Sequence, residues 1–362
     1  MAGNVARRPS GKWRARYRNE MGQERARHFD RKRDARLWLD QIAASVLTGT
    51  YLDPRAGQIT FAQFYKEWSV RQIWAPGTVA AMSLAARSVP FGERPMRQIR
   101  RSDVEVWIKS MDTAGLAPGT VKTRHVNVRS VFRAAVRDRV IDADPSDAVR
   151  LPRRRRADAA MSIPRPDEVG VLMTVAGDKM RAFIALCAFA GLRLGEAAAV
   201  QLDDIDFDRK SLKVARQVQR CTGGTIEIRA PKYGSERVVP LADGMVAVLA
   251  QHVAAVGTVG AEQWLFGVTN EPPHQNEVGY WWRKTLHAAS LSGIKIHDLR
   301  HFYASGLIAA GCDVVAVQHA LGHAKSSTTL NTYAHLWPSS GDRTRAAAQS
   351  VLVASLGLDK TR

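Results

Sequence analysis

The spacing of apolar residues divides the 362-residue chain into parts of different character. Residues 1–50 alternate apolar and polar side chains around a turn at residues 19–22 and then continue at helical spacing, which predicts two short strands and a helix. Residues 59–150 carry apolar side chains at helical spacing, and residues 161–340 combine helical stretches with short alternating runs. The chain is therefore predicted to be a multidomain α+β protein.

Stretches without periodicity predict where these parts are joined. Residues 51–58 contain an Asp-Pro step and a glycine, and residues 151–160 are charged, contain proline and lack an apolar repeat. The predicted order is a small β-sheet plus helix domain (1–50), a linker (51–58), an all-α domain (59–150), a basic linker (151–160), a mainly α domain with a three-stranded antiparallel sheet (161–340) and a helical tail (341–362).

The large C-terminal part is predicted to carry its strands between two groups of helices. The strands are expected within residues 204–218, 225–232 and 237–241, as a meander with turns at glycines 223–224 and 234. Helices are predicted at residues 163–176, 179–190, 243–256 and 278–291.

The segment from residue 297 to 333 carries the most informative chemistry. Three short amphipathic helices are predicted there: one from Asp298 to residue 308, one between Asp313 and Gly322, and one that begins near residue 326. Tyr333 is expected in the middle of the third helix, on a segment that could move. Four side chains of this segment are candidates for catalysis: His297, Arg300, His323 and Tyr333.

Polar residues further upstream fit the same chemistry. Arg193 follows an apolar helix that stops at Gly191, and Glu196, three residues on, could hold its guanidinium in place. Lys232 lies at a turn between two predicted strands. Arginine presents paired donors to phosphate oxygens, histidine can donate or accept a proton near neutral pH, and a tyrosine hydroxyl can serve as a covalent nucleophile. These residue types together predict a tyrosine that attacks a phosphate.

The order of these motifs resembles one known family. G-L-R-x-G-E, a hairpin lysine, H-x-x-R, L-G-H and a tyrosine ten residues later are the pattern of the tyrosine recombinases, or phage integrases. Each motif alone is weak, but five in this order are specific. The resemblance covers roughly residues 170 to 340 and is weaker upstream.

The resemblance implies a role for each candidate. Tyr333 would attack a DNA phosphodiester to give a 3′-phosphotyrosyl link and a free 5′ hydroxyl. Arg193, Arg300 and His323 would donate hydrogen bonds to the non-bridging oxygens. His297 would act as a base or orient the phosphate, and Lys232 would protonate the departing 5′ oxygen. Neither a metal nor another cofactor is expected, because the phosphotyrosyl link conserves the energy of the phosphodiester.

Charge indicates the partner. The chain carries 53 Lys and Arg against 34 Asp and Glu, a formal net charge of +19, which favours a polyanion such as nucleic acid. A charged membrane surface is the alternative, but no apolar run of spanning length and no lipidation motif is present. Three isolated cysteines and the absence of a secretory signal predict a reduced, soluble protein. With the resemblance, the expected location is the bacterial cytoplasm, at the nucleoid.

The expected DNA contacts lie in three parts of the chain. Residues 1–40 hold twelve Lys and Arg against five Asp and Glu. The resemblance makes residues 1–50 an arm-site binding domain and residues 59–150 the core-binding domain. The basic residues expected to contact DNA are Arg14, Arg16, Arg18, Lys122, Arg124, Arg129, Arg133, Arg153, Arg154 and Arg155. A charged face in contact with solvent alone is the alternative for each group.

Several of the candidate residues have alternative roles, or other residues could take their place. His297 and His301, and likewise His319 and His323, stand four apart and could bind zinc, although Arg300 would place a cation beside the metal. Arg193 and Arg300 could instead form structural ion pairs with Glu196 and Asp298. The residues that compete with Lys232 are Lys210, Lys213 and Lys295, and those that compete with Tyr333 are Tyr233 and Tyr303.

The function implied is integration or excision of a phage or mobile element by site-specific recombination. Such an enzyme would act as a homotetramer on double-stranded DNA, joining core and arm attachment sites, and a host DNA-bending protein and an excision factor could assist it. The tail at 341–362 could dock on a neighbouring protomer or on its own domain. The alternatives are a DNA-relaxing enzyme similar to type IB topoisomerases and a basic DNA-binding regulator without catalysis.

Overall fold

The structure is a computed structural model that describes residues 3–19, 22–49, 51–53, 55–152, 161–221, 224–231, 234–267, 269–337 and 340–356. The chain divides into two compact units, Met1–Ala159 and Ala160–Arg362. Within the described residues, no helix is both long and apolar enough to cross a membrane.

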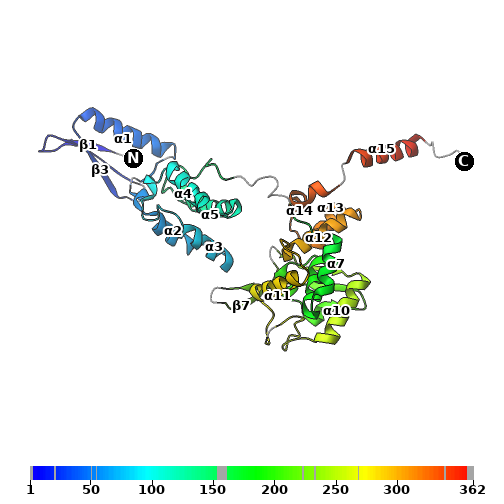
Figure 1. Ribbon diagram of the computed structural model, residues 1–362. Helices are drawn as coiled ribbons and strands as arrows, with labels where there is room; N and C mark the ends of the chain where they lie inside the picture. Colours follow the sequence, from blue (N-terminus) through cyan, green and yellow to red (C-terminus); the bar gives the residue numbers. More distant parts are fainter. Residues whose placement is uncertain are drawn as a thin grey trace. The chain divides into compact units, whose positions relative to one another are not determined.

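The first unit opens with a small antiparallel sheet covered by one helix (Figure 1). Its strands are β1 (Asn4–Arg7), β2 (Trp13–Arg18) and β3 (Glu24–Phe29), in that order, and α1 (Lys32–Leu47) follows. Ala15 and Tyr17 of β2 are buried, and the Tyr17 ring lies 5.4 Å from that of Trp38. The two-strand prediction missed β1, because its four residues are mostly exposed and carry little apolar signal.

The residues after α1 pack onto this sheet. Tyr51 is buried and its hydroxyl lies 2.9 Å from that of Tyr17. The Asp53 carboxylate accepts hydrogen bonds from Asn19 at 2.9 Å and from Nη2 of Arg25 at 2.5 Å. The described part of the stretch expected to be a linker is therefore held by a buried ring and a partly buried ion pair.

The rest of the first unit is helical. Proline at the first position begins α3 (Pro76–Arg87) and α5 (Pro118–Arg137), where its missing N–H costs no hydrogen bond. The core contains the clustered rings of Phe61, Phe91, Trp107 and Phe132. The elements are η1 (Ala56–Gln58), α2 (Phe61–Ser69), α3 (Pro76–Arg87), η2 (Met96–Gln98), α4 (Arg101–Thr113) and α5 (Pro118–Arg137).

The second unit is built around one apolar helix. In α8 (Asp178–Phe189), every residue from Ala182 to Ala188 is buried, because neighbouring helices cover it on all sides. Helices α7 (Pro166–Val175), α10 (Asp243–Val256) and α12 (Ile296–Ala309) pack against it. The other helices are α9 (Leu194–Ala198), α11 (Gln275–Ala288), α13 (Val314–Leu321), α14 (Ser326–Tyr333) with the 3-10 turn η5 (Ala334–Leu336), and α15 (Ser340–Leu356). In α15, the side chains of Val351, Leu352 and Leu356 are exposed.

The strands of the second unit form two small sheets. One has the order β4 (Ile205–Asp206), β5 (Ser211–Val214), β8 (Arg237–Pro240), and the other is a hairpin of β6 (Gln217–Arg220) and β7 (Ile226–Arg229). The predicted meander was wrong in its strand order. β5 pairs directly with β8, where Leu212 lies opposite Val239 and both are fully buried, so the hairpin is an insertion between paired strands. The α+β class and the three-stranded antiparallel sheet are confirmed.

Candidate active site

A tight turn brings Arg193 to the start of α9. Gly191 has a φ of +66°, and a Cβ atom there would overlap the ring of Tyr303. Arg193 is the N-cap of α9, and Glu196 in the first turn accepts its backbone N–H at 3.0 Å and its Nη1 at 2.6 Å. The guanidinium is thus tied to its own helix while about a quarter of the side chain remains exposed.

Glu196 also binds a second arginine. Its Oε2 accepts Nη2 of Arg237, on β8, at 2.9 Å, and the carboxylate is only 1% exposed. Burial alone would raise the pKa of Glu196, but the charge and hydrogen bond of Arg237 and the charge of Arg193 outweigh it and lower the pKa to about 2. Arg237 also donates Nε to the carbonyl of Ala320 at 3.0 Å, so the same network reaches the end of α13.

Arg300 is a buried cation on α12. It is 2% exposed, and its two Nη atoms donate to the carbonyls of Gly191 and Leu321, the second at 2.5 Å. None of the described carboxylates forms an ion pair with it, since Asp298 instead caps the start of α12 by accepting the N–H of Lys295 at 2.8 Å. Burial, and then the charge of Arg193, lower the pKa of Arg300 to about 9. The charge of Glu196 acts in the opposite direction, and the side chain is fixed in place without an ion pair to any described carboxylate.

His323 follows a left-handed turn. Gly322 ends α13 with a φ of +60°, and a Cβ atom there would lie 2.9 Å from Nη1 of Arg237. Nδ1 of His323 lies 2.8 Å from the hydroxyl of Thr329, which is fully buried. Burial, and then the charge of Arg300, lower the pKa of His323 to about 4. The imidazole is neutral at pH 7 with one nitrogen already bonded.

Tyr333 is the last residue of α14, not a mid-helix residue as expected. Its side chain is 1% exposed and packs with Ala304, Ile308 and Leu321 in a small apolar cluster. Its hydroxyl lies 2.7 Å from Nδ1 of His301. Burial raises the pKa of Tyr333, whereas the charges of Arg300 and Arg193 act in the opposite direction. The phenol is therefore un-ionised in the free protein.

These residues meet at one cavity of about 480 Å³. It joins elements that are up to 140 residues apart in sequence, from the turn before α9 to the end of α14. Its lining residues are Arg193, His297, Arg300, His301, Gly322, His323, Ala324, Lys325, Thr328, Thr332 and Tyr333. Tyr303 is absent from the lining and packs against Gly191.

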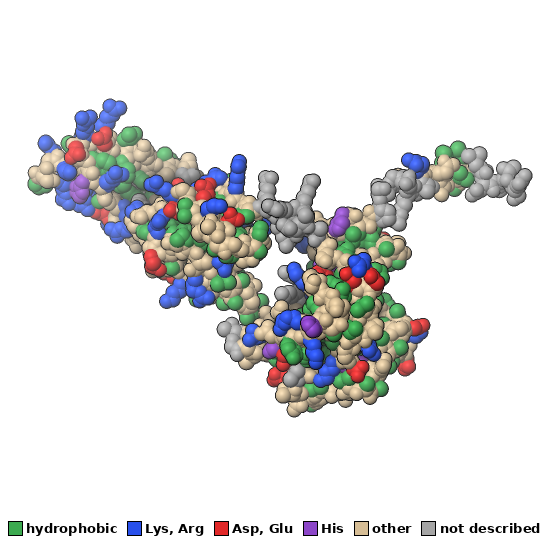
Figure 2. Space-filling view, viewed as in Figure 1, with side chains coloured by type: hydrophobic (Ala, Val, Ile, Leu, Met, Phe, Trp, Pro, Cys, Tyr) green, Lys and Arg blue, Asp and Glu red, His purple; other side chains and the backbone are tan. Residues whose placement is uncertain are grey.

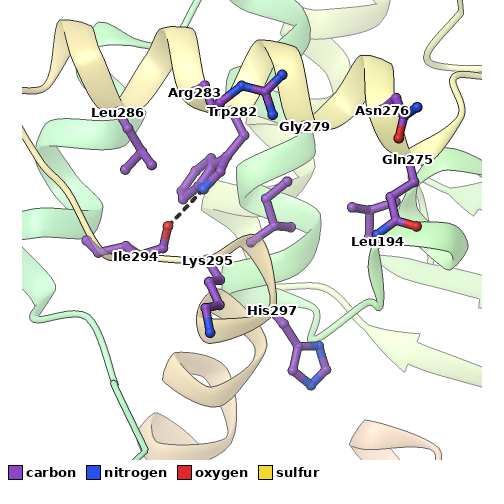
Figure 3. A pocket seen from close by; sticks show the side chains of 11 residues that line it. Leu194, Gln275, Asn276, Gly279, Trp282, Arg283, Leu286, Ile294, Lys295 and His297 are labelled. Carbon is purple, nitrogen blue, oxygen red and sulfur yellow. Dashed lines mark hydrogen bonds between the residues drawn. The ribbon is translucent and has the colours of Figure 1, made fainter. Parts of the chain in front are cut away.

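His297 lies on the boundary between this cavity and a second one of about 830 Å³. Figure 3 shows the second cavity between α11 and the start of α12, where Lys295 and His297 both point away from α11. Arg283 and the amides of Gln275 and Asn276 also line it. Burial, and then the neighbouring His301, lower the pKa of His297 to about 4.

The lysine assignment falls outside what the structure describes. Lys232 and Tyr233 are not among the described residues. Of the rival lysines, Lys210 pairs with Asp243 at 2.6 Å and Lys295 lines the second cavity. Ser235, three residues after Lys232, accepts Nη1 of Arg193 at 3.4 Å, which brings the described end of this turn to the site.

Two of the histidines are bonded to other side chains through Nδ1. Nδ1 of His301 is bonded to Tyr333 and Nδ1 of His323 to Thr329. Across the described parts of the chain, no three His, Cys, Asp or Glu side chains are grouped as metal ligands would be.

Known protein families match both ends of the chain. The family described as phage integrase, N-terminal domain, matches residues 1–48, and the phage integrase family matches residues 165–339. Together the two matches span more than half of the sequence. The chain belongs to the phage integrase family of tyrosine recombinases. This integrase is a site-specific tyrosine recombinase of a phage or mobile element, and its second unit carries the catalytic domain.

Similarity to individual relatives extends over most of the integrase. The integrase of Mycobacterium phage D29 is 23% identical over 340 residues, which cover 89% of each chain. The Tn1549 transposon integrase, solved in complex with a circular intermediate DNA, has a TM-score of 0.67 at 21% identity and covers 81% of this chain and 99% of its own. A lambda integrase tetramer bound to a Holliday junction has a TM-score of 0.58 at 19% identity, over 90% and 97% of the two chains. These structures share the fold of the integrase.

The basic residues of the first unit of the integrase differ in their freedom to bind DNA. Figure 2 shows Lys and Arg side chains spread over the visible face of this unit. Arg14, Arg16 and Arg18 share the face of β2 opposite Ala15 and Tyr17, but Arg14 and Arg16 pair with Glu24 at 2.7 and 3.3 Å. On α5, Lys122 and Arg133 are exposed, Arg124 is half-buried, and Arg129 pairs with Asp144 and Asp147; Arg153, Arg154 and Arg155 lie outside the described residues.

Sequence reasoning missed two polar residues of the site. Arg237 was noted only as part of the run that follows Lys232, and no local pattern signals its bond to Glu196, 41 residues away. His301 was considered only as a zinc ligand. Its spacing from His297 did indicate a shared helical face, and the ring centroids are 4.8 Å apart. Its bond to Tyr333, however, joins two residues that are 32 positions apart in sequence and lie on different helices.

Proposed function

We propose that this integrase cuts and rejoins one DNA strand at a time through attack by the Tyr333 hydroxyl on a phosphodiester. The observation that carries the proposal is the shared cavity, which is lined by Tyr333 together with two arginines and three histidines. Attack gives a 3′-phosphotyrosyl link and releases a 5′ hydroxyl. A second strand's 5′ hydroxyl then attacks the link, so the number of phosphodiester bonds is conserved and no nucleotide is consumed.

Arg193 and Arg300 bind the non-bridging oxygens of the scissile phosphate. Arg300 suits this role because it is already desolvated and fixed by two carbonyls, and no described carboxylate neutralises it. An anion placed beside it gains more than it would beside a solvated arginine. Arg193 is held by Glu196, which fixes its position and leaves part of the guanidinium for the phosphate.

His323 and His297 act as neutral hydrogen-bond donors. Their pKa values of about 4 keep both rings uncharged at pH 7. If Nδ1 of His323 accepts the hydroxyl proton of Thr329, its remaining proton lies on Nε2 and can be donated to a phosphate oxygen. His297, between the two cavities, orients the phosphate. Lys232 is proposed as the acid for the 5′ oxygen on the basis of its motif alone.

The partner is double-stranded DNA, bound by more than one copy of the integrase. The net charge of +19 supports a polyanionic partner, and the Tn1549 and lambda integrases were solved on DNA, the second as a tetramer on a Holliday junction. Residues 1–50 would bind arm sites, residues 59–150 core sites, and the exposed apolar residues of α15 would dock on a neighbouring protomer. A host DNA-bending protein and an excision factor are proposed as further partners.

The test is covalent capture. A duplex carrying the core repeat that flanks the element in its host is nicked close to the cleavage point, so that cleavage releases a short oligonucleotide and cannot be reversed. The integrase is expected to form an adduct that survives denaturing electrophoresis, while Tyr333→Phe binds the same duplex and forms none. A full yield of adduct from Tyr333→Phe would remove Tyr333 from the reaction.

A further inference from the structure

The nucleophile already has a partner in the free protein. The bond of 2.7 Å from the Tyr333 hydroxyl to Nδ1 of His301 is the one hydrogen bond found for that hydroxyl among the described residues. The two rings meet edge to face, with centroids 5.6 Å apart. A hydroxyl paired with an imidazole in this way is the arrangement from which a proton can be removed as the oxygen attacks.

We infer that His301 is the catalytic base of this integrase: its Nδ1 takes the proton of Tyr333 as the phenol oxygen bonds to phosphorus. The inference rests on the proposed function and assigns a role that the sequence motifs gave to His297 or left open. His301 qualifies as a catalytic residue because it touches a reacting atom.

The geometry favours His301 over His297. The two histidines lie one turn apart on α12, with ring centroids 4.8 Å apart, yet His301 and not His297 is bonded to the phenol. Figure 3 shows His297 at the edge of the second cavity, and His297 also lines the cavity that holds Arg193 and Arg300. One imidazole therefore serves the nucleophile and its neighbour serves the phosphate.

The surroundings keep His301 ready to accept a proton. The ring is half-buried, and burial lowers its pKa, with a further lowering by the charge of Arg300 and an opposing effect of Asp298. The lowered pKa favours the neutral ring, and the tautomer with its proton on Nε2 leaves the Nδ1 lone pair to accept the phenol proton. The apolar contacts of Tyr333 with Ala304, Ile308 and Leu321 fix the end of α14 on α12 and α13, so the bond does not depend on a loop.

The proton and the bonds balance over one cycle. The O–H bond of Tyr333 breaks, its oxygen bonds to phosphorus, and the bond from phosphorus to the 5′ oxygen breaks. His301 gains the phenol proton, and the 5′ oxygen gains a different proton from the acid on the other side of the phosphate. In strand joining the 5′ hydroxyl attacks phosphorus, and the imidazolium returns its proton to the departing phenol oxygen. Its position beside Arg300 favours that return, since two cations repel.

The decisive measurement is the single-turnover rate of adduct formation on the nicked core duplex. Removal of a general base lowers a rate by about 10²–10⁴-fold. His301→Ala is expected to fall within that range, and so is His301→Asn, whose amide can hold the hydroxyl but cannot take its proton. The matched control is His319→Ala, an exposed histidine on α13, which should keep the rate of the unchanged protein. Duplex affinity and melting temperature of each variant confirm that it is folded.

A second substrate distinguishes the proposed base, His301, from the proposed acid, Lys232. When sulfur replaces the bridging 5′ oxygen, the leaving group needs no proton, so Lys232→Ala should approach the rate of the unchanged protein. His301→Ala should remain slow on this substrate, because the phenol must still lose its proton. Recovery of His301→Ala on the sulfur substrate would overturn the assignment.

The results distinguish failure of the His301 assignment from failure of the proposed function. A His301→Asn rate within about threefold of the unchanged protein, far from the 10²–10⁴-fold of a general base, would show a positioning role and overturn the base. Full activity of His301→Ala would also overturn the assignment of His301 as the base. Absence of an adduct from the unchanged protein on its own core site would instead overturn the proposed function.

Discussion

Replacing Glu196 by glutamine tests the buried charge network that supports the site. The carboxylate is 1% exposed and bonded to Arg193 and Arg237, and glutamine keeps its shape while removing its charge. A pKa lowered from 4.5 to about 2 corresponds to roughly 3 kcal/mol of stability at pH 7. Breaking a buried ion pair typically costs about 3–5 kcal/mol, which is the same size. Glu196→Gln is therefore expected to destabilise the second unit by about 3 kcal/mol.

The sign of the pH dependence follows from the direction of the shift. Because the pKa is lower in the folded protein, the stabilisation is complete above about pH 5 and is lost as the pH falls towards 2. The difference in free energy of unfolding between Glu196→Gln and the unchanged protein should therefore fall by about half between pH 5 and pH 3. A gap that does not change over this range would mean that the charge of Glu196 is not the source of the stability.

Urea unfolding followed by fluorotryptophan NMR measures this effect in the full chain. Trp264 and Trp282 are buried in the second unit, so their signals report its unfolding separately from the first unit. Glu236→Gln is the matched control, because Glu236 is exposed in the same segment. A loss below about 0.5 kcal/mol for Glu196→Gln, the size of an ordinary surface change, would refute the network as a stabilising element.

Three further changes test the site and the DNA contacts. Gly322→Ala should lower the melting temperature and the cleavage rate together, because a Cβ atom would meet Arg237 at 2.9 Å and φ is +60°; unchanged melting would contradict this. His323→Ala should slow adduct formation by about 10²–10³-fold and leave duplex affinity nearly unchanged in a gel-shift titration. Arg18→Glu should weaken arm-site binding and reduce its salt slope by about 1, with core cleavage intact; equal loss on core duplexes would refute the arm assignment.

The parts of the site that the sequence predicts are those with local signals. His297 and Arg300 share a face because they are three residues apart on one helix, and Glu196 reaches Arg193 for the same reason. Gly322 marks the end of α13 through the left-handed conformation that glycine favours, which places His323 just beyond the helix. Each of these contacts is decided within one or two turns of the backbone, so residue type and spacing suffice to predict it.

The contacts that the sequence does not predict join distant elements. Arg237 reaches Glu196 across 41 residues and the carbonyl of Ala320 across 83. The position of Arg237 depends on the pairing of β8 with β5. The meander prediction paired β8 with the strand before it instead, because all strands in this stretch are short and show the same alternation of apolar and polar residues. Nothing local distinguishes a strand that pairs with its neighbour from one that closes a sheet around an inserted hairpin. The burial of Leu212 and Val239 decides it, and burial is a property of the whole unit.

The charges of the site fit its proposed role in binding a phosphate. Arg193, Arg237 and Arg300 lie together, and one described carboxylate, Glu196, pairs with the first two. Burial, and then the charges of neighbouring arginines, lower the pKa of His323 and of Arg300. A protein that needed only stability would gain from a second carboxylate beside Arg300. This integrase has two backbone carbonyls there instead, which fix the guanidinium without neutralising it, as its proposed role in binding a DNA phosphate requires.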